Sequence, residues 1–451
     1  MDFTLDEGQQ AVADVIGSVL GQDGVLEPEN TWKALVDGGV TALGVPERLG
    51  GDGVGLAEST TALTEIGRRG AISPALATLG LGLLPLLDLA NDAQQDRYLA
   101  GVAGGAVLTA ALDEPGAALP EHPKTSLSGG KLNGTKIAVP YAEQAAWMLV
   151  TTDAGVVVVS PQAAGVTLTR TPASNHSDEY VVSFADVAVE AGDTLDGATV
   201  HRVNQLALAS IGAYGAGLVA GALRLTADYV ATREQFGRPL STFQTVAAQL
   251  AEVYIASRTI SLVSTSVAWQ LAEGPEACPN VDDDLGILGY WLSSQAPPAM
   301  RICHHLHGGM GMDITYPMDR YYSSIKDLTR LEDVVAAVDS EAKSSEEGLA
   351  IVIADMRAHR NPTRMRVLRA LSWKLARRLE CLCPKCAAPG FGLTQSRRGL
   401  PCEACGTPTH WIDFEIDACT ACGHAAVRPR KDGRRTAPRR ACPSCSSAPV
   451  G

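Results

Sequence analysis

Residues 233–244 read REQFGRPLSTFQ and lie between two long segments that have the composition of helices. The preceding segment, residues 201–236, has few helix breakers and many small residues, so we expect a long, closely packed helix. A second helix is expected over residues 242–271. Gly237 and Pro239 favour a turn, because glycine tolerates positive φ and proline fixes φ. The stretch therefore predicts a turn between two helices.

Outward from this turn, the pattern predicts helices, then strands, then helices. Residues 1–108 show apolar residues at three- and four-residue steps, the period of amphipathic helices. Residues 109–200 contain short Val- and Thr-rich runs between turn residues, which indicates a β-domain; Asn133-Gly134 predicts a tight turn within it. Residues 201–331 form a third part, a truncated helical bundle with a last long helix over 283–307. The fold class is α+β and multidomain.

Charge and cysteine divide the chain near residue 349. Residues 349–451 hold 18 Lys+Arg against 7 Asp+Glu, although the whole chain carries a net charge of −13. Nine of the 11 cysteines lie between residues 381 and 445. We expect an acidic linker over 332–348, a basic helix over 349–380 and a cysteine-rich region over 381–451. The acidic N-terminus and the short, proline-interrupted apolar run at 75–87 argue against export and against a membrane protein.

Four C-x-x-C pairs lie in the cysteine-rich region. Two such pairs supply the four thiolates of a tetrahedral zinc site. We expect two zinc ribbons built from consecutive pairs, the first from Cys383, Cys386, Cys402 and Cys405, and the second from Cys419, Cys422, Cys442 and Cys445. Redox-active pairs are the alternative, but no βαβ pattern surrounds them. Cys381, His410 and His424 are spare ligands.

Several strings resemble the acyl-CoA dehydrogenase family over residues 1 to about 331. They include Phe3-x-Leu5-x-x-x-Gln9, Gly44-Val45-Pro46-Glu47-x-x-Gly50-Gly51-x-Gly53, Leu132-Asn133-Gly134-x-Lys136 and the turn at 233–244. The resemblance implies a helical N-terminal domain, a β-barrel-like middle domain and a C-terminal helical bundle. It also implies FAD, an acyl-CoA substrate and an electron-transfer flavoprotein as electron acceptor. The stretches from Asn204 to Gly217 and from His304 to Tyr322 most resemble actinobacterial heteromeric enzymes that act on steroid side-chain CoA thioesters.

In the resembling family, the turn reaches across a subunit interface to the FAD of the neighbouring protomer. The resemblance therefore implies FAD contacts from Arg233, Phe236 and Gln244, because a guanidinium fork suits a pyrophosphate and an amide suits a nucleotide. A second contact is implied for the segment after residue 304, through His305, Gly308, Gly309 and Gly311. An ordinary turn with a solvated arginine is the alternative for the first segment. A metal site at His304, His305 and His307 is the alternative for the second.

Three positions depart from the family pattern. Leu112-Asp113-Glu114-Pro115-Gly116-Ala117-Ala118 stands where the family has T-E-P-x-A-G-S, with a charge in place of the Thr and no Ser. Ala138-Val139-Pro140 stands where the family has an aromatic residue and a hydroxyl for its own flavin. The catalytic base, a carboxylate that takes the α-proton, falls by position on Glu332, without the neighbouring Gly and Thr of the family. The alternative position for the base is Ala207, which cannot accept a proton.

These departures predict a division of labour between two kinds of subunit. Residues that would serve a neighbour's FAD are present, and the segments that would hold the chain's own FAD are weakened. We expect a cytoplasmic α/β heterotetramer with a catalytic dehydrogenase partner and two FAD per tetramer. The rival hypothesis is a zinc-ribbon binding or regulatory protein with an inactive dehydrogenase-like scaffold. The tail from Met356 resembles an uncharacterised bacterial zinc-ribbon family, and its positive charge leaves nucleic-acid binding as a lesser alternative.

Overall fold

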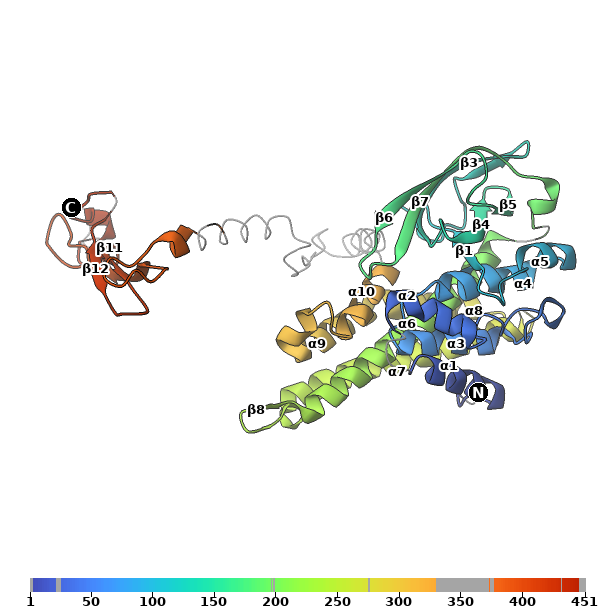
Figure 1. Cartoon of the computed structure of the whole chain (residues 1–451), viewed down its shortest axis with the longest axis horizontal. Coiled ribbons are helices and arrows are strands. Elements are labelled where there is room, and N and C mark those ends of the chain that lie inside the picture. The colour runs from blue at the N-terminus through green and yellow to red at the C-terminus, as the bar shows by residue number, and fades with distance from the viewer. Residues whose placement is uncertain are drawn as a thin grey trace. The chain divides into compact units, whose positions relative to one another are not determined.

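The computed structural model describes residues 3–21, 26–195, 197, 199–274, 276–329, 373, 377–430 and 432–445. The chain divides into two compact units, residues 1–350 and 351–451. The first unit contains helices, then strands, then helices, in the order that the sequence predicts (Figure 1). The linker predicted at 332–348 and most of the basic helix predicted at 349–380 lie outside the described residues.

The N-terminal part of the first unit is helical. Its first helix begins with a capping box, in which the Asp6 carboxylate accepts from the Gln9 backbone N–H and the Gln9 side chain accepts from that of Asp6. Residues 76–83, within the apolar run, form a buried π-helical segment. The elements are α1 (Glu7–Val19), α2 (Pro28–Asp37), η1 (Glu47–Leu49), α3 (Leu56–Arg68), η2 (Leu76–Leu83), α4 (Leu84–Leu89) and α5 (Asp92–Tyr98).

The middle part consists of two sheets that share one apolar core. Their strands are β1 (Val107–Ala111), β2 (Ser126–Ser128), β3 (Lys131–Pro140), β4 (Ala145–Thr152), β5 (Gly155–Val159), β6 (Val166–Pro172) and β7 (Asp178–Ala188). One sheet has the order β1-β4-β5, with β1 parallel to β4, and the other is antiparallel with the order β2-β3-β7-β6. The prediction of a turn at Asn133-Gly134 is wrong: both residues lie inside β3, and the turn is made by Gly129 and Gly130 at φ 57° and 70°.

A buried ion pair ties the two sheets together. Lys136 Nζ on β3 lies 2.9 Å from Glu114 Oε1, and it also donates to Leu112 O and to Thr151 Oγ1 on β4. Burial alone would raise the pKa of Glu114, but hydrogen bonds from Lys124, Thr125 and Lys136 outweigh it and lower the pKa to about 2. Glu114 belongs to the segment that departs from the family pattern, and here it holds the loop after β1 against β3.

The C-terminal part of the first unit is a bundle around one long helix. The elements are η3 (Ala191–Asp193), α6 (Val200–Thr232), β8 (Glu234–Gln235), β9 (Arg238–Pro239), η4 (Leu240–Thr242), α7 (Gln244–Glu273), α8 (Val281–Ser294), α9 (Ala296–His307), η5 (Gly308–Met312) and α10 (Met318–Leu328). The single helix predicted over 283–307 is two helices. Pro297 and Pro298 lack backbone N–H groups, so a new helix begins at Ala296.

Helix α6 lies in the core of this unit, and it crosses α3 at glycines. A Cβ on Gly217 would lie 2.0 Å from Thr64 O, and one on Gly67 would lie 2.2 Å from Tyr214 O, so only hydrogen atoms fit between the two backbones. Among the described helices, α6 alone is long and apolar enough to span a membrane, but 78% of its most apolar window is buried inside the unit. Its apolar composition therefore follows from its place in the core.

The second unit contains a three-stranded antiparallel sheet of β10 (Gly392–Arg398), β11 (Ile412–Ala418) and β12 (Ala425–Arg428), in that order. A short 3₁₀ helix, η7 (Arg439–Ala441), follows the sheet. The C-x-x-C pairs lie in the segments before, between and after these strands.

Candidate cofactor interface and metal centres

The predicted turn is a two-stranded hairpin at the far end of α6 and α7, away from the β-domain (Figure 1). Arg233 follows the last residue of α6 and Gln244 is the first residue of α7. The Arg233 carbonyl accepts from the Leu240 N–H at 2.8 Å and closes the hairpin. Both side chains are exposed in the single chain. The fold thus presents a guanidinium and an amide on one projecting element.

Phe236 stands at the tip of this hairpin in a conformation that large residues avoid. Phe236 and Gly237 have φ of 55° and 77°, as in the I′ turns of two-residue hairpins. For a residue as large as phenylalanine, this conformation costs on the order of 1–3 kcal/mol. The ring is 92% exposed and lies 6.2 Å from the ring of Phe243, which also carries the Arg238 guanidinium at 4.1 Å. The strained turn presents an aromatic ring and a cation outward.

The glycine segment predicted as the second FAD contact follows α9 directly. Gly308 has φ 59° and ψ −131°, a backbone conformation open to glycine, and a Cβ on Gly311 would lie 2.6 Å from His304 O. His305, Gly308 and Gly309 are exposed, and Gly311 is buried. A Cβ at Gly308 or Gly309 would meet no heavy atom of the described residues within 4 Å, so a ligand can approach the backbone closely.

His307 joins the glycine segment to α6. Its Nε2 lies 3.2 Å from Thr226 Oγ1, its Nδ1 lies 3.1 Å from the Tyr316 hydroxyl, and its ring lies 4.4 Å from that of Tyr229. Burial and the neighbouring His304 lower the pKa of His307 to about 4, so the imidazole is neutral at pH 7. Sequence reasoning considered His307 only as a metal ligand and missed this positioning role.

The structure does not gather the three histidines around a common point. His305 is exposed, His307 is buried against α6, and the His304 ring lies 5.2 Å from that of Tyr322. Within the part of the chain that the structure describes, only the two cysteine sets have the geometry to hold a metal ion. Glu332, the predicted base, lies outside the described residues.

The segments that depart from the family pattern are engaged in local structure. Asp113 Oδ1 accepts from the Leu119 N–H at 3.0 Å, and the Asp113 carbonyl accepts from the Ile137 N–H. Ala138 has φ 57°, and the pairing of β3 with β7 is irregular between Lys136 and Val139. Ala138, Val139 and Pro140 offer neither an aromatic face nor a hydroxyl. These three positions therefore supply no stacking contact and no side-chain hydrogen bond to a flavin ring.

The neutral His307 makes stability depend on pH. Its folded pKa of about 4 lies below the ordinary value of 6.5, so the unfolded chain binds the extra proton and stability falls as the pH falls from about 6.5 towards 4. We expect the free energy of unfolding of the native protein to drop by about 2 kcal/mol more than that of His307→Gln between pH 7.5 and pH 5, measured by urea denaturation. His305→Gln, at an exposed position of the same segment, should keep the native pH dependence. An equal pH dependence in His307→Gln would contradict this assignment.

The cysteine pairs combine differently from the prediction. Cys383 and Cys386 share one cluster with Cys419 and Cys422, and Cys402 and Cys405 share the other with Cys442 and Cys445. The grouping of consecutive pairs into two tandem ribbons is therefore wrong, although the same eight cysteines are used. The first pair joins the third and the second joins the fourth.

The antiparallel sheet causes this interleaving. The first pair precedes β10 and the third lies between β11 and β12, and Ala418 at the end of β11 is paired with Gly392 on β10 and with Ala425 on β12. These two pairs therefore meet at one end of the sheet. The second pair lies between β10 and β11, where Arg398 faces Ile412, and the fourth pair follows β12; both lie at the opposite end. Seven-residue strands separate the two clusters by roughly 20 Å.

The sulfur geometry fits a tetrahedral ion. In a tetrahedron with Zn–S bonds of about 2.3 Å, the sulfurs lie about 3.8 Å apart. The distance between Cys383 Sγ and Cys422 Sγ is 3.7 Å, and that between Cys405 Sγ and Cys442 Sγ is 3.6 Å. A disulfide would require about 2.05 Å.

The backbone around the C-x-x-C pairs also suits thiolate ligands. The residues that follow the first three pairs, Ala387, Gly406 and Gly423, have φ of 57°, 74° and 70°. The Lys385 and Ala404 N–H groups each donate to a cysteine sulfur at 3.4 Å. Such bonds stabilise the thiolate form that binds a metal.

The interleaved arrangement can be tested by counting metal ions. A variant with Cys383, Cys386, Cys419 and Cys422 changed to serine keeps one complete cluster, and we expect it to bind one Co²⁺ with the absorption spectrum of a tetrahedral thiolate site. The matched control, with Cys383, Cys386, Cys402 and Cys405 changed, breaks both clusters and should bind no Co²⁺ with four thiolates. Tandem pairing would give the opposite pair of results.

The comparisons with known proteins bear on the first unit. Residues 9–106 match the model "Acyl-CoA dehydrogenase, N-terminal domain", and residues 205–332 match "Acyl-CoA dehydrogenase, C-terminal domain". Over 331 residues the chain is 70% identical to the acyl-CoA dehydrogenase FadE28 of Mycobacterium tuberculosis, an alignment that covers 73% of this chain and 95% of that relative. The chain belongs to the acyl-CoA dehydrogenase family. It is also 30% identical over 350 residues to FadE27 of the same organism, covering 72% of this chain and 93% of that relative.

Solved structures of the family have the same fold. A chain of the ChsE4-ChsE5 complex from Mycobacterium tuberculosis is 28% identical, with a TM-score of 0.66 over 76% of this chain and all of that chain. A variant of the Tcur3481-Tcur3483 steroid ACAD is also 28% identical, with a TM-score of 0.62 over 75% of this chain and 98% of that chain. The predicted acyl-CoA dehydrogenase fold is confirmed, and FAD is the typical cofactor of the family.

A third model matches residues 313–446, described as "Domain of unknown function (DUF6671)". It overlaps the C-terminal dehydrogenase match at residues 313–332 and contains all eight clustered cysteines. The predicted resemblance of the tail to an uncharacterised family is confirmed.

Proposed function

We propose that this chain is one subunit of a heteromeric FAD-dependent acyl-CoA dehydrogenase, in which it completes the FAD site of a catalytic partner. The observation that carries the proposal is the contrast between two parts of the chain. The hairpin projects Arg233, Phe236 and Gln244 into solvent, where a second subunit can reach them. The β-domain, in contrast, has Ala138-Val139-Pro140 where the family provides flavin contacts.

Two of the similar structures support a mixed assembly. One is a chain from the ChsE4-ChsE5 complex, and the other is a steroid ACAD whose name joins two proteins, Tcur3481 and Tcur3483. Exposed apolar side chains on two segments also favour a subunit contact: Tyr254 and Ile255 on α7 are 56% and 59% exposed, and Met312 at the end of η5 is 73% exposed. We propose an α/β heterotetramer with two FAD, with a steroid side-chain CoA thioester as substrate.

The bound FAD would supply the acceptor for a hydride from the β-carbon of the thioester. The residues of this chain would bind and orient it. The Arg233 guanidinium would pair with a pyrophosphate, Gln244 would hydrogen-bond a nucleotide, and the open backbone at Gly308 and Gly309 would let the cofactor approach closely. His307 would keep the glycine segment against α6. An electron-transfer flavoprotein is the proposed electron acceptor and the cytoplasm the proposed location.

FAD content tests the division of labour. Purified alone, the chain should hold no stoichiometric FAD, whereas its complex with the co-purifying dehydrogenase subunit should hold two FAD per tetramer. In that complex, Arg233→Met should weaken FAD binding by about tenfold to a hundredfold, because a hydrogen bond to a charged group is worth about 1.5–3 kcal/mol. Arg170→Met, at an exposed arginine on β6, is the control. Stoichiometric FAD with turnover in the isolated chain would refute the proposal.

Glu332→Gln in the same complex decides which subunit supplies the base. If Glu332 accepts the α-proton, kcat should fall by roughly 10²–10⁴, since glutamine cannot accept a proton. Unchanged turnover would remove Glu332 from the mechanism and assign the base to the partner. The proposed division of labour predicts this second result.

A further inference from the structure

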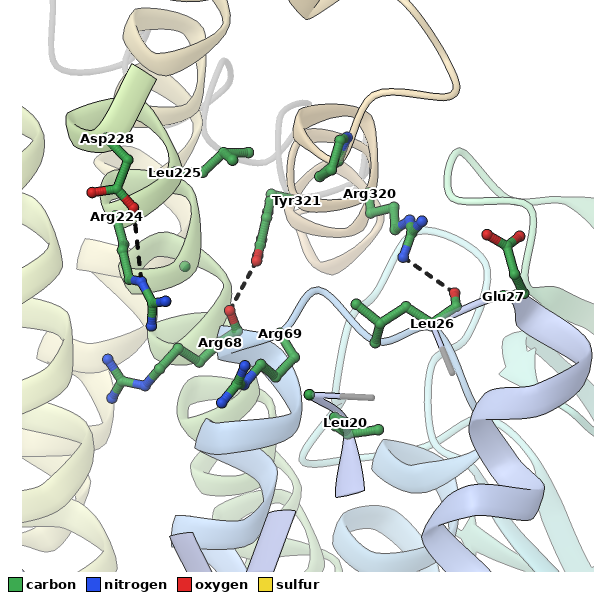
Figure 2. Close-up of a pocket in the computed structure, with 13 residues that line it drawn as sticks. Leu20, Leu26, Glu27, Arg68, Arg69, Arg224, Leu225, Asp228, Arg320 and Tyr321 are labelled. Atoms are coloured by element: carbon green, nitrogen blue, oxygen red, sulfur yellow. Dashed lines mark hydrogen bonds and ion pairs between the residues drawn. The ribbon is translucent and has the colours of Figure 1, made fainter. Parts of the chain in front are cut away.

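A separate cavity in the first unit is lined by four arginines. It has a volume of about 450 Å³ and lies where α1, α2, α3, α6 and α10 come together (Figure 2). Its lining residues are Leu20, Gly21, Leu26, Glu27, Arg68, Arg69, Gly221, Arg224, Leu225, Asp228, Pro317, Arg320 and Tyr321. The cavity falls within the size range of small-molecule sites, about 300–1,000 Å³.

The walls of the cavity carry an excess of positive charge. Four guanidinium groups face two carboxylates, those of Glu27 and Asp228. Arg68 is paired with Glu65 at 2.8 Å, and Arg224 lies at the limit of pairing with Asp228, at 4.0 Å. In the described part of the chain, no carboxylate lies within ion-pair distance of Arg69 or Arg320. Positive charge concentrated in a cavity of an otherwise acidic unit attracts anions selectively.

The Arg69 side chain packs against α1, but its buried Nε–H group has no hydrogen-bond acceptor among the described residues. Its terminal nitrogens lie over the end of α1, where a Cβ on Gly17 would come within 3.3 Å of Nη2 and one on Gly21 within 3.8 Å of Nη1. An unpaired buried donor is costly, and because Nε is buried, only the terminal nitrogens of Arg69 are open to a ligand.

The opposite side of the cavity is fixed by α10. Arg320 Nη1 donates to Leu26 O at 3.2 Å, which leaves its other donors available (Figure 2). The buried Tyr321 donates its hydroxyl hydrogen to Arg68 O at 2.9 Å, and its ring packs over Gly221. Arg69 and Arg320 therefore stand at the end of α3 and on α10, two helices that the Tyr321 hydrogen bond holds together.

The remaining walls are apolar. Leu20, Leu26, Leu225 and Pro317 surround the charged groups, so the cavity offers contacts for an organic body as well as for an anionic group. The α6 residues of the cavity, Gly221, Arg224, Leu225 and Asp228, recur at three- and four-residue steps and share one face of the helix. Thr226, which meets His307, lies on another face. The cavity and the glycine segment thus use different sides of α6.

We propose that this cavity binds an organic phosphate, with Arg69 and Arg320 as its main ligands to the phosphate oxygens. The planar guanidinium group matches phosphate geometry through paired N–H donors. Arg224 and Arg68 add charge at the edge, and the leucine side chains contact the organic part. None of the residues proposed to contact FAD is among the lining residues.

Calorimetric titration of the full chain tests the proposal, with inorganic pyrophosphate and ADP as probes. We expect both to bind, with ADP tighter because its nucleoside contacts the apolar walls. The double variant Arg69→Met/Arg320→Met should weaken both by at least about tenfold. Arg224→Glu, at a side chain that is 71% exposed, is a second variant with little effect on packing, and it should weaken binding as well.

Two controls distinguish binding in this cavity from binding elsewhere on the chain. Arg258→Met removes one positive charge from α7, which contributes no lining residue to the cavity, and should leave binding unchanged. Arg233→Met should also leave it unchanged, because ADP resembles part of FAD and could otherwise occupy the hairpin. Absence of binding in the native chain, loss of binding in Arg233→Met, or equal loss in Arg258→Met would each overturn the proposal. If the Arg233→Met variant loses FAD from the complex but still binds ADP, the result supports both the proposed FAD contact of Arg233 and the proposed phosphate site in the cavity.

Discussion

The close crossing of α3 and α6 is the constraint on which the first unit depends. Gly67 and Gly217 let the two backbones approach to distances that no side chain would permit. This contact fixes α6, and α6 in turn carries the hairpin at its end, the Thr226 hydroxyl that meets His307, and one wall of the arginine-lined cavity. An alanine at either glycine would push α6 away from α3 and so displace all three features at once.

The hairpin and the β-domain of this chain differ in the side chains that they offer to a cofactor. The hairpin exposes the residues that are proposed to contact a partner's FAD, whereas residues 138–140 of the β-domain offer neither an aromatic ring nor a hydroxyl group. On the hairpin, the positive φ of the exposed Phe236 lowers the stability of the isolated chain. A second subunit that buried this ring together with Arg233 would offset the loss through the free energy of binding. In the β-domain, the Glu114–Lys136 pair and the Asp113 contacts stabilise the loops where the family carries flavin-binding hydroxyls. In this structure the side chains of Asp113 and Glu114 therefore stabilise the fold of the β-domain.

Local sequence patterns predicted the order of helices and strands, but they could not predict contacts between residues that are far apart in the sequence. The helix–strand–helix order, the turn at 233–244 and the eight cysteines follow from periodicity and short motifs. Arg69, Arg224 and Arg320 lie on segments far apart in the sequence, so nothing local indicates that they line one cavity. The turn predicted at Asn133-Gly134 was wrong because a dipeptide that is typical of turns does not show whether its residues pair with a neighbouring strand. The C-x-x-C spacings of 15 and 19 intervening residues suit either pairing, and only the order of β10, β11 and β12 decides between them.

The interleaved clusters impose an order on the assembly of the tail during synthesis. The first cluster is complete once Cys422 has emerged from the ribosome, because its four ligands end there. In the second cluster, Cys402 and Cys405 are synthesised early, but the cluster is incomplete until Cys442 and Cys445 have also emerged. A nascent tail would therefore carry one complete set of four thiols beside an incomplete one, and the unpartnered thiols of Cys402 and Cys405 are the point at which oxidation or a competing metal would divert its maturation.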